Sequence, residues 1–440
     1  MSGRFLKVVI MMVAVTAMTG ELFAERPALK KLDGRVVGTV NFEGPRPKRK
    51  RIRLTQKNGQ RSNCHALHEK GLLDENLIVG EKGELANVFV YVTKGLTKNS
   101  FPIPKKPAVL DQVNCMYRPR VLGVRVGQQL LMRNSDPLVH NVRSLSLENR
   151  PFNIAQPAKT PDRAKLFKKP EKAIAVQCDF HPWMKAYIFA IDHPFFAVTN
   201  AQGKFAITGL PAGEYTLVAW HEELGEQQTS VTVTNTGRID ARFSFKQKEN
   251  GEALPDDLSA AGVSRTNTTS APPAPKRRFV KMWKPEDFAG DLDDLAQHSP
   301  IRGREVFHAA ACIKCHVIAG KGTKLGPDLT EVAKRYKVPK LLEQILKPSK
   351  EIHKDFQTHA FATTDGRTIV GLVIKEDAGA IHVLPNPLKP KQIEVIQKAE
   401  VVKRFKSQLS TMPEGLLMTF KKSELLDLLS FLLAGGKTKE

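Results

Sequence analysis

The run Cys312-Ile-Lys-Cys315-His316 restricts what this chain can fold into more than any other feature. Two Cys separated by two residues and followed directly by His form the attachment pattern of a c-type haem, in which the thiols bond to the vinyl groups and the His binds the iron. A redox dithiol or half of a zinc site is the alternative, but the sequence has no second pair with zinc-site spacing. The motif therefore predicts a domain built around one covalent haem.

A second group of metal-binding residues lies near the middle of the chain. Cys178, His181 and Met184 stand three residues apart between two strand-like runs, and His140 follows another strand and a polar turn. A type 1 copper centre takes two imidazoles and a thiolate in one plane, with a weak axial thioether. These residues supply that set and predict one copper ion, whereas Met is a poor zinc ligand. The alternative is a buried free Cys with incidental neighbours.

The first 24 residues have the pattern of a secretory signal peptide. Two basic residues precede the apolar run 8–17, and a small-residue site ends at Ala24. The apolar run is short for a bilayer span, so an uncleaved anchor is the less favoured alternative. We expect an exported protein of the periplasm or cell envelope.

Export also bears on the five Cys of the chain. Copper and haem account for three, and an oxidising compartment favours a disulfide between Cys64 and Cys115. These residues are 115 − 64 = 51 positions apart, and a loop of that size is worth about 4 kcal/mol in the chain-entropy model. The alternative is a small metal site of Cys64, His65 and His68.

The formal net charge of +23 restricts the class of partner. A balance this basic would suit nucleic acid, but export argues against that partner. We expect an acidic redox partner protein, or at most peripheral contact with an anionic membrane surface or an envelope polyanion. Part of the charge is concentrated in residues 46–53, which can equally be a solvated face.

The pattern of the chain divides it into a β-rich and a helical half. Short strand-like runs recur from residue 34 to 245, whereas helical periodicity begins near residue 300 and is interrupted by a strand-like stretch at 356–401. We expect an all-β N-terminal half and a mainly α C-terminal domain with a β-rich insertion. The expected segments are a signal peptide at 1–24, a copper domain at 33–192, a small β module at 193–246, a disordered linker at 247–278 and a haem domain at 279–436.

The copper segment resembles the cupredoxin family over about residues 80–192. Its Cys-x2-His-x2-Met spacing is similar to that of the short-loop members such as amicyanin, whereas plastocyanins have a longer loop. The resemblance implies a Greek-key β-sandwich in which His181 reaches the surface as the electron port, with Pro182 and Trp183 as an apolar docking rim. We also expect Asn141 to hydrogen-bond to the Cys178 loop.

The haem segment resembles class I c-type cytochromes. Gly303 and Phe307 stand where such proteins pack their first helix against the last, and the Pro327 carbonyl would accept a hydrogen bond from the His316 ring. Residues 279–433 are also similar to an exported haem-binding-domain family of CxxCH proteins. That similarity rests on Gly326-Pro-Asp-Leu-Thr330, Leu346-Lys-Pro-Ser349, Thr364-Asp-Gly366 and Ser410-Thr-Met412-Pro413.

The distal haem ligand is inferred from position. Met412 precedes the last helix, where class I cytochromes place their axial Met, and Met/His ligation suits electron transfer. However, 412 − 316 = 96 residues separate it from His316, with the β-like insertion between them. The competing candidates are Met418, His353, His359 and His382.

Residues 193–246 resemble the carboxypeptidase-regulatory-like, or transthyretin-like, β module. The turn Leu210-Pro-Ala-Gly213 and the strand-like run 214–220 carry that resemblance. Such modules are usually structural. For Trp220-His221-Glu222 we therefore expect a packing Trp beside surface polar residues.

Both predicted cofactors move one electron at a time, which favours an electron carrier over a catalyst. Electrons would pass between copper and haem, and a flexible linker would let the two domains dock transiently. One alternative is a subunit or domain of a haem-dependent oxidoreductase, such as a peroxidase or dehydrogenase complex. Another is a non-redox binding protein of the envelope.

Overall fold

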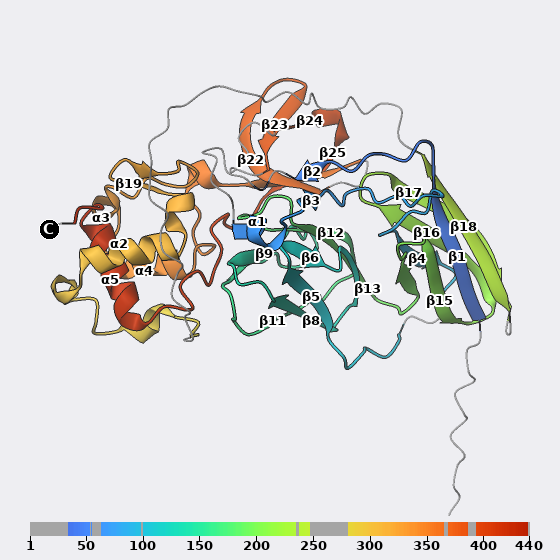
Figure 1. Ribbon diagram of the computed structural model, residues 1–440, viewed down its shortest axis with the longest axis horizontal. Coiled ribbons are helices and arrows are strands. Elements are labelled where there is room, and N and C mark those ends of the chain that lie inside the picture. The colour runs from blue at the N-terminus through green and yellow to red at the C-terminus, as the bar shows by residue number, and fades with distance from the viewer. Residues whose placement is uncertain are drawn as a thin grey trace, which may run out of the picture.

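The computed structural model describes residues 34–52, 54, 63–97, 100–234, 237–246, 280–364, 368–385 and 393–438. Two β bodies and one helical body lie in a row, and a small sheet lies beside the central body (Figure 1). The predicted signal peptide and linker lie outside the described residues. The β-rich first half and the helical end with a β insertion agree with the expected fold class.

The outer body is a sandwich of two sheets with strand orders β15-β1-β18 and β14-β4-β16-β17. Its strands are β1 (Gly34–Glu43), β4 (Phe89–Lys94), β14 (Phe196–Val198), β15 (Lys204–Leu210), β16 (Gly213–His221), β17 (Gly225–Val233) and β18 (Arg238–Lys246). β1 pairs with β15 on one side and β18 on the other. The predicted boundaries 33–192 and 193–246 therefore do not separate the sheets. The apolar residues of β1 and β4 complete the core of the outer body.

The central body is a second sandwich, with strand orders β10-β9-β12-β13-β7 and β11-β8-β5-β6. Its strands are β5 (Ala108–Val113), β6 (Met116–Arg118), β7 (Val121–Arg125), β8 (Gln129–Asn134), β9 (His140–Ser144), β10 (Asn153–Gln156), β11 (Arg163–Leu166), β12 (Glu171–Gln177) and β13 (Lys185–Ile191). The helix α1 (Asn63–Leu67) and the strand pair β2 (Arg51–Ile52) and β3 (Leu72–Leu73) cover one end. The predicted disulfide between Cys64 and Cys115 is confirmed and fastens α1 to the turn between β5 and β6.

The helical body contains α2 (Pro300–Ala309), α3 (Val332–Arg335), α4 (Val338–Leu346) and α5 (Lys422–Leu433), with the short strands β19 (Val317–Ile318) and β20 (Lys321–Gly322). α2 crosses α5 closely at Gly303, where a Cβ atom would lie 2.0 Å from the carbonyl oxygen of Asp427. The rings of Phe307 and Phe431 lie 5.6 Å apart beside this crossing. The predicted contact of the first helix with the last is therefore confirmed.

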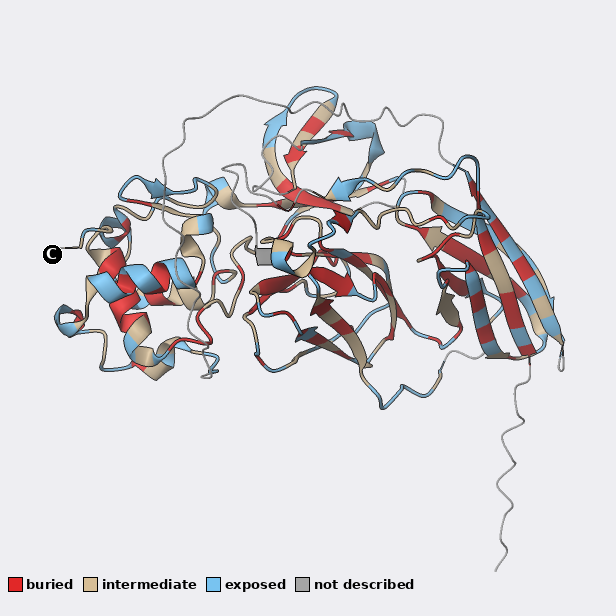
Figure 2. Ribbon diagram, viewed as in Figure 1, coloured by how far each residue is buried: buried red, intermediate tan, exposed pale blue. Residues whose placement is uncertain are grey.

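A five-stranded sheet is inserted between α4 and α5, in the order β24-β23-β22-β21-β25. Its strands are β21 (His359–Thr363), β22 (Thr368–Glu376), β23 (Ala380–Leu384), β24 (Glu394–Gln397) and β25 (Val401–Lys406). Ala360 and Val370 of this sheet pack on Leu145 of the central body. Burial thus continues across the junction (Figure 2). Asp365 and Gly366, which belong to one of the runs similar to the haem-binding-domain family, lie outside the described residues.

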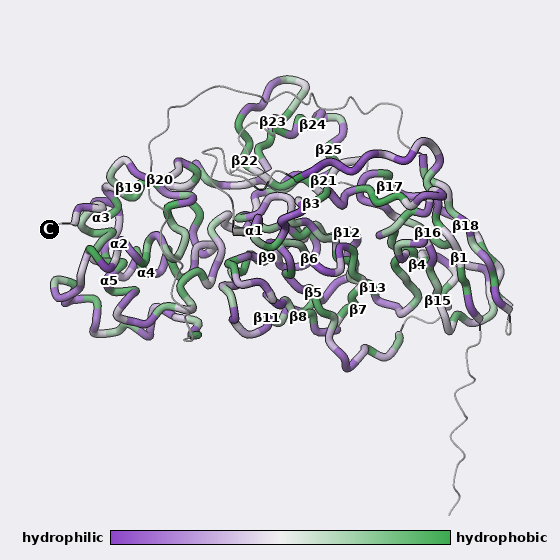
Figure 3. The backbone as a smooth tube through the Cα atoms, viewed as in Figure 1, coloured by the Kyte–Doolittle hydropathy of each residue, from purple (hydrophilic) through white to green (hydrophobic). Residues whose placement is uncertain are grey.

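The described part of the basic run, residues 46–52, leads from the outer body into β2 and is hydrophilic (Figure 3). Arg46 Nε donates to the carbonyl oxygen of Val79 at 2.9 Å, and Arg49 Nε donates to that of Asp74 at 2.7 Å. The guanidinium groups of Arg46 and Arg49 therefore attach this run to neighbouring backbone. No helix in the described ranges is both long and apolar enough to cross a membrane.

A buried ion pair joins the two β bodies. Arg120 of the central body donates from Nη2 to Glu222 Oε2 of the outer body at 2.8 Å, and the two side chains are only 2% and 3% exposed. His221 is also buried, whereas Trp220 packs on Tyr187 and Phe189. The expectation of surface polar residues at 221–222 was wrong, because this segment is covered by the neighbouring body.

We expect His221 to make the protein sensitive to mild acid. Burial, aided by the charge of Arg120, lowers the pKa of His221 to about 4, against about 6.5 in an unfolded chain. Because the folded state resists protonation, the stabilisation is present above pH about 6.5 and is lost as the pH falls towards 4. The loss reaches about 3 kcal/mol, at about 1.36 kcal/mol for each pH unit.

The variant His221→Asn removes this titration and should flatten the fall of the urea-unfolding free energy between pH 7 and 4. Its Oδ1 can still accept from the Glu223 N–H, as His221 Nδ1 does at 3.2 Å. His353→Asn is the matched control, since His353 Nδ1 accepts a similar bond from the Asp355 N–H at 3.3 Å but its side chain is 49% exposed. Equal pH dependence in both variants would contradict the prediction.

Candidate metal centres

The sandwich brings the predicted copper residues to one end of the central body. His140 begins β9, Cys178 directly follows β12, and His181 and Met184 lie in the loop that leads into β13. Two backbone hydrogen bonds close this loop, from the Met184 N–H to the His181 carbonyl at 2.8 Å and from the Cys178 N–H to the Met184 carbonyl at 3.2 Å. The tight loop 178–184 and the first residue of β9 therefore bring the predicted copper residues to the same end of the sandwich.

The ligand atoms of three of these residues face one another. His140 Nδ1 lies 2.8 Å from His181 Nδ1, and Cys178 Sγ lies 3.7 Å from His181 Nδ1. All three atoms lie within 4.8 Å of one another, and Met184 is fully buried. Two imidazoles and a thiol that face one another, with a buried Met in the same loop, match the donor set of type 1 copper.

Asp136 orients His140 from outside the cluster. Its Oδ2 accepts from His140 Nε2 at 2.8 Å and from the Cys115 N–H at 2.7 Å. Burial alone would raise the pKa of Asp136, but the bonds from His140, Cys115 and Asn114 lower it, so the carboxylate stays charged. An acceptor at Nε2 leaves Nδ1 of His140 free to bind a metal. The sequence interpretation missed Asp136, although it stands in the polar turn before His140.

Asn141 holds the Cys178 loop, as expected. Its Oδ1 accepts from Cys178 Sγ at 3.3 Å and from the Asp179 N–H at 2.8 Å. Asn141 therefore tethers the thiol and the first residue of the loop together. The hydrogen bond predicted from its place beside His140 is confirmed.

Burial sets the protonation of the cluster. It raises the pKa of the Cys178 thiol to about 12, so the thiol is neutral until a metal displaces its proton. Burial also lowers the pKa of His181 well below its usual range, and the nearby His140 and Lys314 lower it further. The His181 ring is therefore uncharged at neutral pH and keeps a lone pair for a metal.

His181 does not form the exposed electron port that the cupredoxin resemblance implied. Its exposed fraction is 9%, and Trp183 turns inward to donate from Nε1 to the Cys115 carbonyl at 3.1 Å. The disulfide lies beside the same ring, because the sulfur atoms of Cys64 and Cys115 lie within 4.8 Å of a His181 nitrogen. The packing of the Cys64–Cys115 segment thus covers this side of the loop.

The haem motif follows α2. Cys312 begins a 3-10 turn, Cys312–Lys314, and both motif Cys are free thiols of intermediate exposure. His316 Nδ1 lies 2.9 Å from the Pro327 carbonyl, which is the predicted contact. A Cβ atom at Gly326 would lie 2.8 Å from the His316 ring, so glycine is needed there.

These contacts fit a covalently attached haem. The Pro327 carbonyl occupies Nδ1 of His316 and leaves Nε2 for iron. The two thiols stand on the same turn as the His, as thioether attachment requires. The residues of the motif are therefore arranged to hold the group that the motif predicts.

The candidate distal ligands lie in different parts of the C-terminal region. Met412 is half-buried in the irregular segment that precedes α5, with its N–H bonded to Ser410 Oγ at 3.1 Å. His359 and His382 lie on the inserted sheet, and His353 caps a short turn. Met412 as the distal ligand stays a prediction.

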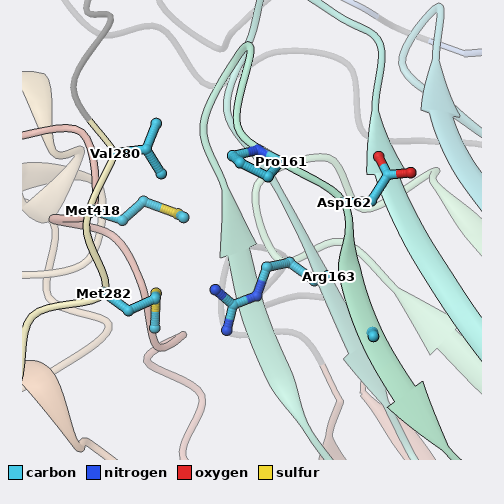
Figure 4. A pocket seen from close by; sticks show the side chains of 7 residues that line it. Pro161, Asp162, Arg163, Val280, Met282 and Met418 are labelled. Carbon is cyan, nitrogen blue, oxygen red and sulfur yellow. The ribbon is translucent and has the colours of Figure 1, made fainter. Parts of the chain in front are cut away.

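Met418, another competitor, lies at the border with the central body. It lines a cavity of about 280 Å³ together with Met282, Val280 and residues 161–164. Figure 4 shows the Met418 and Met282 side chains facing Pro161 and Arg163 across this cavity. Its thioether thus lines the junction between the two bodies.

The structure places the two motifs against each other, which the sequence did not indicate. Lys314, inside the haem motif, holds its Nζ 5.5 Å from the ring centre of Phe180 in the copper loop. Burial raises the pKa of Cys315 to about 11, and the adjacent carboxylate of Asp179 raises it further. Asp179 and Phe180, which directly follow Cys178, therefore lie near Cys315 and Lys314 of the haem motif.

Comparisons with known proteins bear on parts of the chain. The cytochrome c family matches residues 301–378. Domain II of polysaccharide lyase family 4 matches residues 190–241, so the resemblance of this stretch to a carboxypeptidase-regulatory-like module stays a prediction. No curated protein matches the chain.

Several solved structures are similar to part of the chain. They include a copper-containing nitrite reductase from Thermus scotoductus (19% identity, 23% of this chain and 26% of the reductase, TM-score 0.19). They also include a purple cupredoxin from Nitrosopumilus maritimus (20% identity, 19% of this chain and 98% of the cupredoxin, TM-score 0.17). A mutant of amicyanin with Cu(I) shows 19% identity over 22% of this chain and 99% of its own, with a TM-score of 0.18. Likeness this low carries no argument about copper.

The two candidate centres thus rest on different grounds. The copper assignment depends on the geometry of His140, Cys178 and His181 themselves. The haem assignment has both the motif with its Pro327 contact and a family match. Residues 301–378 in the C-terminal part of this chain match the cytochrome c family, and that family implies a covalently bound haem.

Proposed function

We propose that this protein is an exported carrier that passes single electrons between a type 1 copper centre and a covalent haem c. One observation carries the proposal: the copper loop at Asp179 and Phe180 lies against Lys314 and Cys315 of the haem motif. A short path between two one-electron sites is what such a carrier needs. Catalysis would instead require room for a substrate at one of the metals.

The chain's own residues do the positioning. Copper and haem, when bound, each supply a reversible one-electron change. His140, Cys178 and His181 would hold copper, and Asp136 and Asn141 keep those side chains in place without metal. Ligands that are already oriented need little rearrangement when the charge of the metal changes, which favours fast transfer.

The test uses the full chain matured in an exporting host. We expect one haem and one copper per chain, with both a thiolate-to-copper band and a c-type Soret band. After a flash reduces one centre, the electron should reach the other at a rate that does not depend on protein concentration. A rate proportional to protein concentration, or protein without copper, would refute the proposal.

Asp136→Ala should weaken copper binding about 10–100-fold, since loss of an outer partner of a ligating His typically has that effect. The affinity can be measured by competition with a copper chelator. Asp162→Ala is the matched control, because Asp162 is a carboxylate of the same body that pairs with Arg133 at the surface, at 2.8 Å. Equal loss of affinity in both variants would show that Asp136 has no particular role.

We further propose that the redox partner is acidic. The net charge of +23 favours association with an acidic protein over a neutral one. The association rate with an acidic partner should then fall steeply as ionic strength rises. A rate that is insensitive to salt would contradict this.

A further inference from the structure

We propose that Asn153 is a positioning residue that joins the copper loop to the haem segment carrying Met412. This residue is 3% exposed and lies on β10 at the border of the two bodies. On the copper side, its Oδ1 accepts from Asn141 Nδ2 at 2.7 Å, and its Nδ2 donates to Asp179 Oδ2 at 3.1 Å. Both partners belong to the network around Cys178.

The same amide also reaches the haem body. Asn153 Nδ2 lies 3.2 Å from the carbonyl oxygen of Thr411 and 3.3 Å from that of Ser410. These are the two residues directly before Met412. One side chain therefore contacts the surroundings of both candidate centres, although 257 and 258 positions separate it from its haem-side partners.

The backbone beside Asn153 makes this junction firm. The Glu414 N–H donates to the Asn153 carbonyl at 3.1 Å, and the Ala155 N–H donates to the Glu414 carbonyl at 2.8 Å. Residue 414 thus pairs in parallel with Ile154 at the edge of β10. Glu414 thus adds one bridge to the edge strand β10 and satisfies the Asn153 carbonyl and the Ala155 N–H of that edge.

A continuous hydrogen-bonded route follows from these contacts. It runs from Cys178 Sγ to Asn141, then to Asn153, and then to the carbonyl of Thr411. Buried networks of this kind strengthen one another and fix the orientation of each member. A movement of the copper loop is therefore transmitted to the main chain before Met412. This role rests on the proposed function, because it needs metals at both ends.

The test compares the Asn153→Leu variant with the unmodified protein, both full-length and both loaded with copper and haem. Leu has a similar volume but cannot donate or accept, so both links break. We expect the copper hyperfine splitting in electron paramagnetic resonance and the Met-to-haem charge-transfer band to change together. The intramolecular transfer rate should fall by about tenfold or more, the range seen when outer partners of metal ligands are removed.

Two further variants make the result decisive. If Asn153→Leu prevents folding, Asn153→Asp is used instead. The Asp side chain can still accept the hydrogen bond from Asn141. It cannot donate to Asp179 or to the carbonyls of Ser410 and Thr411, and its carboxylate repels these oxygen atoms. Lys403→Ala is the control, because it removes an exposed ion pair between β25 of the inserted sheet and Glu148 of the central body (3.6 Å), outside the contacts of Asn153, and should leave both spectra unchanged.

Each outcome decides the point. Joint changes in both spectra support the link. A change at copper alone, or at neither centre, overturns it. The two spectra do not require electron transfer between the centres. They therefore test the link even if the unmodified protein shows no intramolecular transfer. That result would refute the proposed function and not the role of Asn153.

Discussion

Replacing Cys178 by Ser is expected to abolish the thiolate-to-copper band and all electron exchange with the haem, while the haem stays attached. A hydroxyl is a far weaker ligand for copper than a thiolate, and it has no comparable charge-transfer transition. The fold should survive, since Ser is close to Cys in size. Its hydroxyl can also donate to Asn141 Oδ1, as Cys178 Sγ does at 3.3 Å.

The raised pKa of Cys178 adds a second readout. Because that pKa is about 12 in the metal-free protein, copper must displace the thiol proton at neutral pH. Calorimetry in buffers of different ionisation enthalpy should therefore show proton release on copper binding to the natural protein but less to Cys178→Ser. The unchanged Soret band serves as the internal control. A retained blue band in the variant would rule out Cys178 as the thiolate ligand.

Glu222→Gln is expected to lower the free energy of unfolding by about 3–5 kcal/mol, because it leaves the buried charge of Arg120 without its counter-charge. Burial raises the pKa of Glu222, while Arg120 beside it acts in the opposite direction. The pair therefore lies where desolvation is strong. Urea unfolding followed by tryptophan fluorescence measures the loss, since Trp220 lies two residues before Glu222 in the chain.

Two comparisons test whether burial is the reason. Asp162→Asn breaks the exposed pair with Arg133, whose side chains are 46% and 28% exposed, and should lower the stability by about 1 kcal/mol or less. The double replacement of Arg120 by Met and Glu222 by Leu should recover much of the stability lost in Glu222→Gln. A loss no larger than that of Asp162→Asn would refute the prediction.

Local spacing made some of the site predictable. Cys312, Cys315 and His316 lie on one turn, and the Pro327 carbonyl contacts the His316 ring as expected. Asn141 also hydrogen-bonds to the Cys178 loop, as we expected for the residue next to His140. The arrangement of Cys312, Cys315 and His316 follows from their spacing on one turn, whereas the Pro327 contact was expected from the resemblance to class I c-type cytochromes.

Contacts between distant segments were not predictable in the same way. The apolar residues of β1 and β4 are like those of the other strands, and only side-chain packing decides that these two strands belong with residues 196–246. The buried His181 ring lies beside the disulfide of Cys64 and Cys115, two residues far from it in the chain. Alternating apolar residues predict that a strand has a partner but do not identify the partner.

The amino-acid sequence by itself determined the two metal-binding motifs, the disulfide and the order of β and helical regions, because each depends on residue identity at short spacing or on elimination among five Cys. Only the tertiary structure decided that Lys314 meets Phe180 and that Asn153 meets Thr411. Those contacts depend on the complementary shapes of two folded bodies, which spacing along one chain does not encode.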